Sequence, residues 1–288
     1  MQWTFVEPTQ GVFNYTEGDI VTSKAKKHGL YLRCHALVWH SQLAPWVDAA
    51  TADWTPDQLR KIIVDHITKV AGHWKGQCYA WDVVNEALNE DGTYRESVFY
   101  NVLGEEYIKL AFQTAAKVDP KAKLYYNDYN LESPSAKTEG AQRIVKLLRK
   151  AGIKIDGVGL QTHLVAESPP TLDQHIDAIK GFADLGVEVA LTEVDIRLTT
   201  PSTPANLALQ RQAYKNVSFS ASCPSAAHAN SPRSSVLASR LRAALASPSG
   251  ISMTPSAGCP LSSLPRATLR CGSRTSPSIP PTMESLRP

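Results

Sequence analysis

Short apolar runs alternate with helically spaced segments along most of this chain. Five such runs are expected to be strands; they cover 30–39, 78–87, 122–129, 157–163 and 188–195. Runs of this length, bounded by polar residues, are typical of strands buried on both faces of a parallel sheet. The segments between them place apolar residues on one side of a helix, as Leu59, Ile63 and Ile67 do after the start at Thr55-Pro56. This alternation predicts an α/β fold with a parallel sheet.

The other expected helices are recognised from helically spaced apolar residues and from glycines that mark where a helix ends. One helix covers 16–28 and stops at His28-Gly29. Three more are expected, one around 107–115, one ending at Lys150 and one over 172–183.

Two glutamates stand where predicted strands stop. Glu86 lies in Trp81-Asp-Val-Val-Asn-Glu-Ala87, and Glu193 lies in Leu191-Thr-Glu-Val194. In a (β/α)₈ barrel the carboxyl ends of all strands meet at one mouth, where the active site lies. Two glutamates placed there suit the two-carboxylate chemistry of glycosidases, with one acid and one nucleophile or base. Either glutamate alone is weak evidence, because a glutamate at a strand end is usually a surface residue or part of a salt bridge.

Length and charge narrow the classes of function. With 288 residues the chain can bury a large core, as one α/β domain or two smaller ones. Its net charge of +3 is too small and too mixed to indicate nucleic-acid binding. No apolar stretch is long enough for a membrane span. The first residues also lack the basic and apolar regions of a signal peptide.

The cysteines and two sequence triplets carry little information by themselves. The five cysteines lack metal-ligand spacing, and Cys34 and Cys78 lie in apolar runs, which favours buried thiols. Asn14-Tyr15-Thr16 and Asn216-Val217-Ser218 match the N-glycosylation pattern, which often occurs by chance.

The pattern breaks down near Asn216. The last 72 residues, 217–288, contain 18 Ser and 10 Pro but only one aromatic residue and one acidic residue. Nothing in this segment has sustained helical or strand periodicity. It is either a disordered Ser/Pro-rich tail or the product of a frame change caused by a splicing or sequencing fault; the abruptness favours the second. We therefore expect a catalytic barrel over 1–216 and a separate tail over 217–288.

Six short segments stand at, or just after, the ends of expected strands. They are Trp3-Thr-Phe-Val-Glu-Pro8, His35-Ala-Leu-Val-Trp-His-Ser-Gln42, Trp81-Asp-Val-Val-Asn-Glu-Ala87, Tyr126-Asn-Asp-Tyr-Asn130, Gly159-Leu-Gln-Thr-His163 and Leu191-Thr-Glu-Val-Asp195. In this order they resemble glycoside hydrolase family 10, the (β/α)₈-barrel endo-β-1,4-xylanases. The resemblance spans residues 3–216, about three quarters of the chain.

The resemblance implies a retaining hydrolysis by two carboxylates. Glu86 would be the general acid/base and Glu193 the nucleophile, with their carboxyl groups about 5–5.5 Å apart. Asn85 would bind the sugar 2-hydroxyl in a contact that strengthens in the transition state. No metal or organic cofactor is expected, because two carboxylates suffice for this chemistry.

Four more residues match substrate-site positions of the family. Gln161 and His163 would surround the two carboxylates, and His163 would hold Glu193 in its charged form. His35 and Trp39 would contact the glycone sugar, with Trp39 as an apolar platform. Without the motifs, each of these residues is more often structural. Asn127 and Asp128 are interpreted as residues that end a strand through turn chemistry. Three others, His40, Trp46 and Tyr129, are expected to be structural.

The chain also departs from the family pattern. It begins after the family's first two strands, Gln2 stands where the family has Lys, and the tail replaces the last strand with its Trp residues. About five of eight strands are recognisable, so we expect an incomplete (β/α)₈ TIM barrel. Because an unclosed sheet has unpaired edges, we expect this polypeptide to fold poorly and to have little activity.

The lead hypothesis is a fragment, or a faulty translation, of a secreted fungal-type endo-1,4-β-xylanase. Its substrate would be xylan or xylo-oligosaccharides, and it would be a monomer. Secretion is inferred only from the location of the polymer outside cells. One alternative is another retaining (β/α)₈ glycosidase such as a β-1,4-glucanase, although the segment at 35–42 counts against it. The other alternative is an inactive barrel fragment that at most binds carbohydrate.

Overall fold

A computed structural model describes residues 1–48 and 53–220. All of these residues belong to a single unit. No described helix is long and apolar enough to cross a membrane.

Five parallel strands form the central sheet, in the order in which they occur along the chain. They are β1 (Leu32–Trp39), β2 (Cys78–Asn85), β3 (Lys123–Asp128), β4 (Gly157–Leu160) and β6 (Glu188–Leu191). All eight residues of β2 but one are buried, as expected for a strand covered on both faces. The expected parallel sheet is therefore present, and each of the five predicted runs contains one of its strands.

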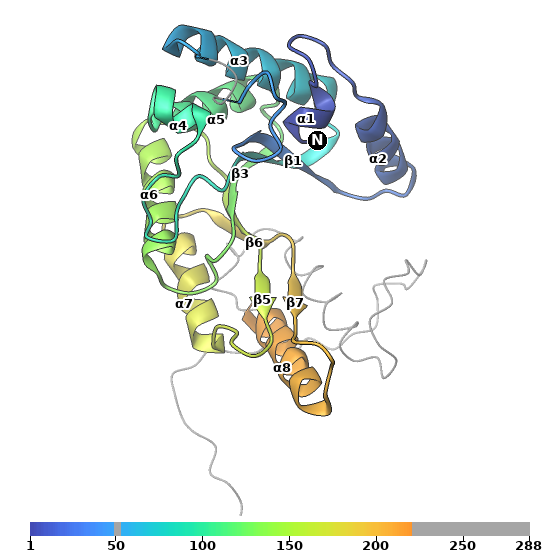
Figure 1. Cartoon of the computed structure of the whole chain (residues 1–288), viewed down its shortest axis with the longest axis vertical. Helices are drawn as coiled ribbons and strands as arrows, with labels where there is room; N and C mark the ends of the chain where they lie inside the picture. The colour runs from blue at the N-terminus through green and yellow to red at the C-terminus, as the bar shows by residue number, and fades with distance from the viewer. Residues whose placement is uncertain (49–52, 221–288) are drawn as a thin grey trace, which may run out of the picture. The chain divides into compact units, whose positions relative to one another are not determined.

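Helices connect the strands, as in consecutive βα units. They are α1 (Trp3–Val6), α2 (Thr16–Lys27), α3 (Pro56–His73), α4 (Val98–Leu103), α5 (Glu106–Val118), α6 (Ala136–Lys150), α7 (Leu172–Ala183) and α8 (Pro204–Ser220). Helices α4, α6 and α7 lie on the same side of the strands (Figure 1). Helix α3 begins where predicted: Thr55 is its N-cap and forms a capping box with Gln58, and Pro56 is the first helical residue.

Two predicted strands are interrupted. The runs 157–163 and 188–195 end as sheet strands at Leu160 and Leu191, and the chain then forms a small parallel pair, β5 (His163–Val165) and β7 (Asp195–Arg197). Thr162 has a φ of 65°, which breaks the extended conformation between β4 and β5. Two residues expected in the active site lie in these breaks, Gln161 between β4 and β5 and Glu193 between β6 and β7.

The expected boundary at residue 216 lies inside a helix. Helix α8 continues to Ser220, and Val217 is fully buried. The remainder of the expected tail, 221–288, lies outside the described residues.

The expected buried thiols are wrong, because Cys34 and Cys78 form a disulfide. Both residues are buried, at 1% and 4% exposure. They are 44 residues apart in sequence, but β1 and β2 are neighbours and bring their Cα atoms to 5.7 Å. Sequence spacing alone contains no sign of this pairing.

Candidate active site

The strand register places the expected site residues together at the carboxyl ends of the strands. Trp39 is paired with Asn85, which is paired with Asn127 on the next strand. The ladder continues past the strand ends, because the Glu86 N–H donates to the Asn127 carbonyl (2.9 Å). In the same way the Glu193 N–H donates to the Gln161 carbonyl (3.0 Å). The carboxyl ends of all five sheet strands thus present their side chains at the same end of the sheet.

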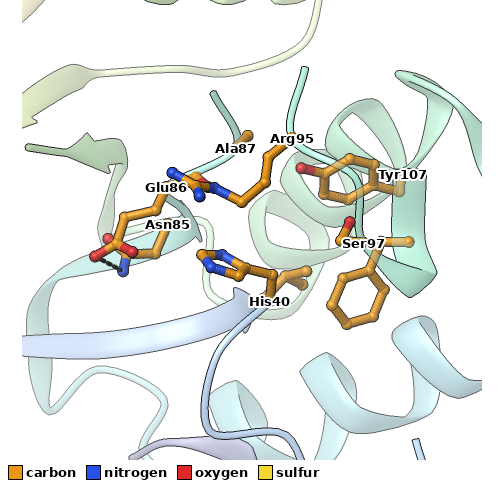
Figure 2. Close-up of a pocket in the computed structure, with 9 residues that line it drawn as sticks. His40, Asn85, Glu86, Ala87, Arg95, Ser97 and Tyr107 are labelled. Atoms are coloured by element: carbon orange, nitrogen blue, oxygen red, sulfur yellow. Dashed lines mark hydrogen bonds between the residues drawn. The ribbon is translucent and has the colours of Figure 1, made fainter. Parts of the chain in front are cut away.

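Three expected residues hold the carboxylate of Glu86. Trp39 Nε1 donates to Oε2 (2.9 Å), while Gln161 Nε2 (2.9 Å) and Asn85 Nδ2 (3.2 Å) donate to Oε1. Figure 2 shows the Asn85 amide beside this carboxylate. Trp39 thus has a polar contact through its indole N–H, in addition to the apolar ring face considered from sequence.

The backbone of Glu86 is in the left-handed region, with a φ of 55°. This conformation is costly for a residue with a side chain and persists only where the surroundings enforce it. Its carbonyl accepts a hydrogen bond from Arg95 Nε (3.1 Å), and Arg95 in turn donates to the Tyr129 hydroxyl (2.7 Å). Backbone strain of this kind clusters at functional sites, which strengthens the interpretation of Glu86.

Glu193 has different partners. Asn127 Nδ2 donates to its Oε1 (3.0 Å), and His163 Nε2 lies 3.3 Å from its Oε2. The other ring nitrogen of His163 lies 2.9 Å from Asp195 Oδ2, which fixes the ring between two carboxylates. The Glu193 side chain is 35% exposed, so it is accessible to a substrate.

Asn127 connects the two halves of the site. Its amide nitrogen donates to both Glu193 Oε1 and Asn85 Oδ1 (both 3.0 Å), and its amide oxygen accepts from the Thr192 hydroxyl (2.8 Å). Because the oxygen has a donor, the amide orientation is defined. Asn127 is fully buried. The sequence assigned it only an end-of-strand role, since its position beside Asn85 becomes visible only with the register.

His35 lies farther from the two glutamates. Its Nδ1 is 3.0 Å from Asp82 Oδ2, and Arg33 also pairs with Asp82. The His35 ring packs edge-on against Trp39, with centroids 5.8 Å apart. The structure therefore brings Glu86, Trp39, Asn85 and Gln161 into direct contact, joins Glu193 and His163 to them through Asn127, and places His35 beside Trp39.

A small pocket lies next to Glu86. His40, Arg95, Ser97, Phe99 and Tyr107 contribute to its lining, and its volume of about 10 Å³ suits one water molecule (Figure 2). Burial, followed by the nearby Arg95 charge, lowers the pKa of His40. His40 is therefore neutral at pH 7, with its buried Nδ1 unpartnered in the described part of the chain.

An ion cluster around a buried lysine supports the turn after β3. The Lys137 amine is fully buried between Glu90 (2.9 Å) and Asp128 (3.1 Å) and lies over the Tyr129 ring. Burial raises the pKa of Asp128 to about 6, against the opposing effect of Lys137. This cluster ties the loop after β2 to the loop after β3, at the carboxyl end of the sheet.

This arrangement suits acid, base and nucleophilic chemistry by carboxylates. Glu86 is surrounded by hydrogen-bond donors, and Glu193 is exposed and oriented by an amide and an imidazole. Within residues 1–48 and 53–220, no group of three or more His, Cys, Asp or Glu side chains is placed to hold a metal ion.

Comparisons with known proteins agree on one family. The sequence model described as "Glycosyl hydrolase family 10" matches residues 1–228. Endo-1,4-beta-xylanase A of Humicola insolens is 79% identical over 216 residues, which are 75% of this chain and 57% of that protein. Endo-1,4-beta-xylanase D of Talaromyces funiculosus is 52% identical over 215 residues, 75% of this chain and 52% of that protein. The chain thus spans just over half the length of these relatives.

Solved structures give the same fold. A GH10 xylanase from Bispora sp. MEY-1 with xylobiose superposes with a TM-score of 0.74 at 39% identity, covering 77% of this chain and 68% of that one. Xylanase 10B from Thermotoga petrophila in complex with xylobiose gives 0.75 at 33% identity, covering 78% and 68%. The expected (β/α)₈ barrel class is confirmed, with five of its strands in the described sheet.

Proposed function

The chain belongs to glycosyl hydrolase family 10, and from this premise we propose that its site is that of an endo-1,4-β-xylanase. The reaction is hydrolysis of internal β-1,4-xylosidic bonds in xylan, with retention at the anomeric carbon. The observation that carries the proposal is the delivery of Glu86 and Glu193 from separate strands to one hydrogen-bonded network.

The first step forms a glycosyl-enzyme. A carboxylate oxygen of Glu193 attacks the anomeric carbon, and the bond from that carbon to the leaving oxygen breaks. Glu86 donates its proton to the leaving oxygen. Asn127 and His163 keep the nucleophile aimed, because each contacts a different oxygen of Glu193.

The second step releases the sugar. Glu86, now a carboxylate, takes a proton from water, and the water oxygen displaces Glu193 from the anomeric carbon. The N–H donors from Trp39, Asn85 and Gln161 stabilise this charged form of Glu86. Asn85 uses one amide hydrogen on Glu86, and its second amide hydrogen is assigned to the sugar 2-hydroxyl.

The names of the relatives support xylan rather than cellulose as the substrate. The fungal relatives described above are named endo-1,4-β-xylanases, and two structural neighbours were solved with xylobiose. A β-1,4-glucanase is the runner-up, since it would use the same two carboxylates. Activated aryl β-xylobioside and aryl β-cellobioside separate the two, and we expect the xylobioside to react faster.

Covalent trapping tests the roles of both glutamates. A 2-fluoro aryl xylobioside should label the intact chain once, on the peptide that contains Glu193. Glu193→Ala should remove the label, whereas Glu86→Ala should still be labelled, because an activated leaving group needs no proton. Glu139→Gln changes an exposed carboxylate on α6 and serves as the matched control. Labelling of another residue, or faster reaction of the cellobioside, contradicts the proposal.

We further propose that the protein is secreted and acts as a monomer. The polymer substrate lies outside cells, and disulfides such as Cys34–Cys78 form in oxidising compartments. Family membership does not decide the location, since a neighbour from Thermoanaerobacterium saccharolyticum is described as an intracellular xylanase. Detection of the native protein in culture fluid, with the monomer mass by light scattering, tests both statements.

A further inference from the structure

The segment before α2 exposes two side chains and anchors the one between them. Asn14 and Thr16 are exposed, while Tyr15 is half-buried. The Tyr15 ring stacks on His73 with centroids 3.8 Å apart and packs edge-on against Trp74. Because Tyr15 is fixed on α3, its two neighbours are held at the surface.

The local backbone gives Asn14 a defined orientation. The Thr16 N–H donates to Asn14 Oδ1 (3.1 Å), which forms an Asx turn. The Asn14 N–H donates to the Val6 carbonyl (2.8 Å), so the turn is tied to α1. With Oδ1 used inside the turn, the amide nitrogen is left without a hydrogen-bond partner among the described residues.

We propose that Asn14 is an N-glycosylation site. Its amide nitrogen would attack the anomeric carbon of a lipid-pyrophosphate-linked oligosaccharide. The new carbon–nitrogen bond replaces the carbon–oxygen bond to pyrophosphate, the lipid pyrophosphate leaves, and the amide nitrogen gives one proton to a base. The acceptor triplet Asn14-Tyr15-Thr16 meets the pattern for this reaction, and an exposed loop can carry the bulky product. The modification is separate from the hydrolytic site and depends on the proposed secretion.

The second acceptor triplet has the opposite surroundings. Asn216 lies inside helix α8, is half-buried, and accepts a hydrogen bond from Gln212 Nε2 (2.9 Å). Ser218, the third residue of that triplet, is only 5% exposed. A helical backbone does not form the Asx turn seen at Asn14, so we expect no glycan at Asn216.

Expression of the full chain in yeast, behind a cleavable secretory leader, tests the proposal. Protein from the culture fluid and from the secretory compartments is analysed by mass spectrometry before and after peptide N-glycosidase treatment in ¹⁸O water. We expect most molecules to carry one glycan and the isotope label to appear at position 14. Asn14→Gln and Thr16→Ala should abolish the shift, whereas Thr16→Ser and Asn216→Gln should keep it.

Two results would overturn the site: a chain without a glycan in both fractions, or a glycan on Asn216 with none on Asn14. Because retained protein is also measured, poor folding does not hide either outcome. Glu193→Ala should be glycosylated as the parent chain is, so failure of the glycosylation proposal leaves the proposed hydrolysis standing, and the reverse also holds.

Discussion

At the scale of the residue, the orientation of one buried amide controls both carboxylates. Asn127 can donate to Glu193 and to Asn85 only while its oxygen faces the Thr192 hydroxyl. Asn85 then has its own oxygen occupied, so its nitrogen is directed at Glu86. A polar group in a buried network acts on its neighbours in this way because an unsatisfied donor or acceptor is costly there.

Changes at Asn127 and Thr192 should therefore affect catalysis. Asn127→Asp replaces the amide that donates to Glu193 with a carboxylate that repels it. We therefore expect kcat/KM on an aryl xylobioside to fall about 100-fold, which corresponds to a loss of roughly 3 kcal/mol in transition-state stabilisation. Thr192→Val should cost about 10-fold, whereas Thr192→Ser should be close to the parent. An unchanged kcat/KM in Asn127→Asp would contradict this role of Asn127.

His175 makes stability depend on pH. It is 1% exposed on α7, both ring nitrogens lack partners in the described part of the chain, and burial lowers its pKa from 6.5 to about 4. Between these two values the unfolded chain binds a proton that the folded chain does not, so stability falls as the pH is lowered through this window.

Replacement of His175 by leucine should remove this dependence. The free energy of unfolding of His175→Leu minus that of the parent chain should become more positive as the pH is lowered from 7 to 4.5. We expect this increase to be at most about 3 kcal/mol. Urea unfolding at both pH values measures the difference. His28→Leu, at an exposed position after α2, is the control and should leave the pH dependence unchanged. A constant difference between the His175 variant and the parent would contradict the expectation.

At the scale of the element, the strands were easier to predict than the helices around them. Each predicted run contains a strand because continuous apolar sequence is what a doubly covered strand requires. Helix α8 was missed because its buried positions include the small residues Ala213, Ser218 and Ser220, while Leu207 and Leu209 are exposed. Helix α1 has only four residues, too few for any periodicity.

The disulfide joins the two elements that carry Trp39 and Glu86. It closes a 44-residue separation between β1 and β2, so its loss should increase the freedom of the unfolded chain. We expect the double change Cys34→Ala with Cys78→Ala to lower the free energy of unfolding by about 2–4 kcal/mol, measured with denaturant. The parent chain with reductant should approach the same midpoint. Equal stability of the double variant and the oxidised parent chain would contradict this role of the disulfide.

At the scale of the whole molecule, both halves of the site depend on outer strands of the sheet. Strand β1 carries His35 and Trp39, and β6 leads to Glu193; each is paired on one side only within the described residues. Strands at a sheet edge open more readily than central ones, because fewer contacts hold them.

A polypeptide of residues 1–288 should therefore be a poor catalyst. We expect its kcat/KM on xylan to be about 1,000-fold below that of a family member with eight paired strands, roughly 4 kcal/mol. Rates of purified protein of confirmed mass, compared with its Glu86→Ala variant as the baseline, measure this. Rates within 10-fold of the eight-stranded enzyme would contradict the expectation.

The sequence by itself determined the class of the fold, the positions of the main strands and the two glutamates at their ends. These features are local, since hydrophobic periodicity and short motifs are readable within a few residues. Only the tertiary structure decided that Asn127 links the carboxylates, that Cys34 meets Cys78, and that Asn14 is exposed while Ser218 is buried. Each of these depends on strand register or helix packing, which brings residues that are tens of positions apart in the sequence into contact.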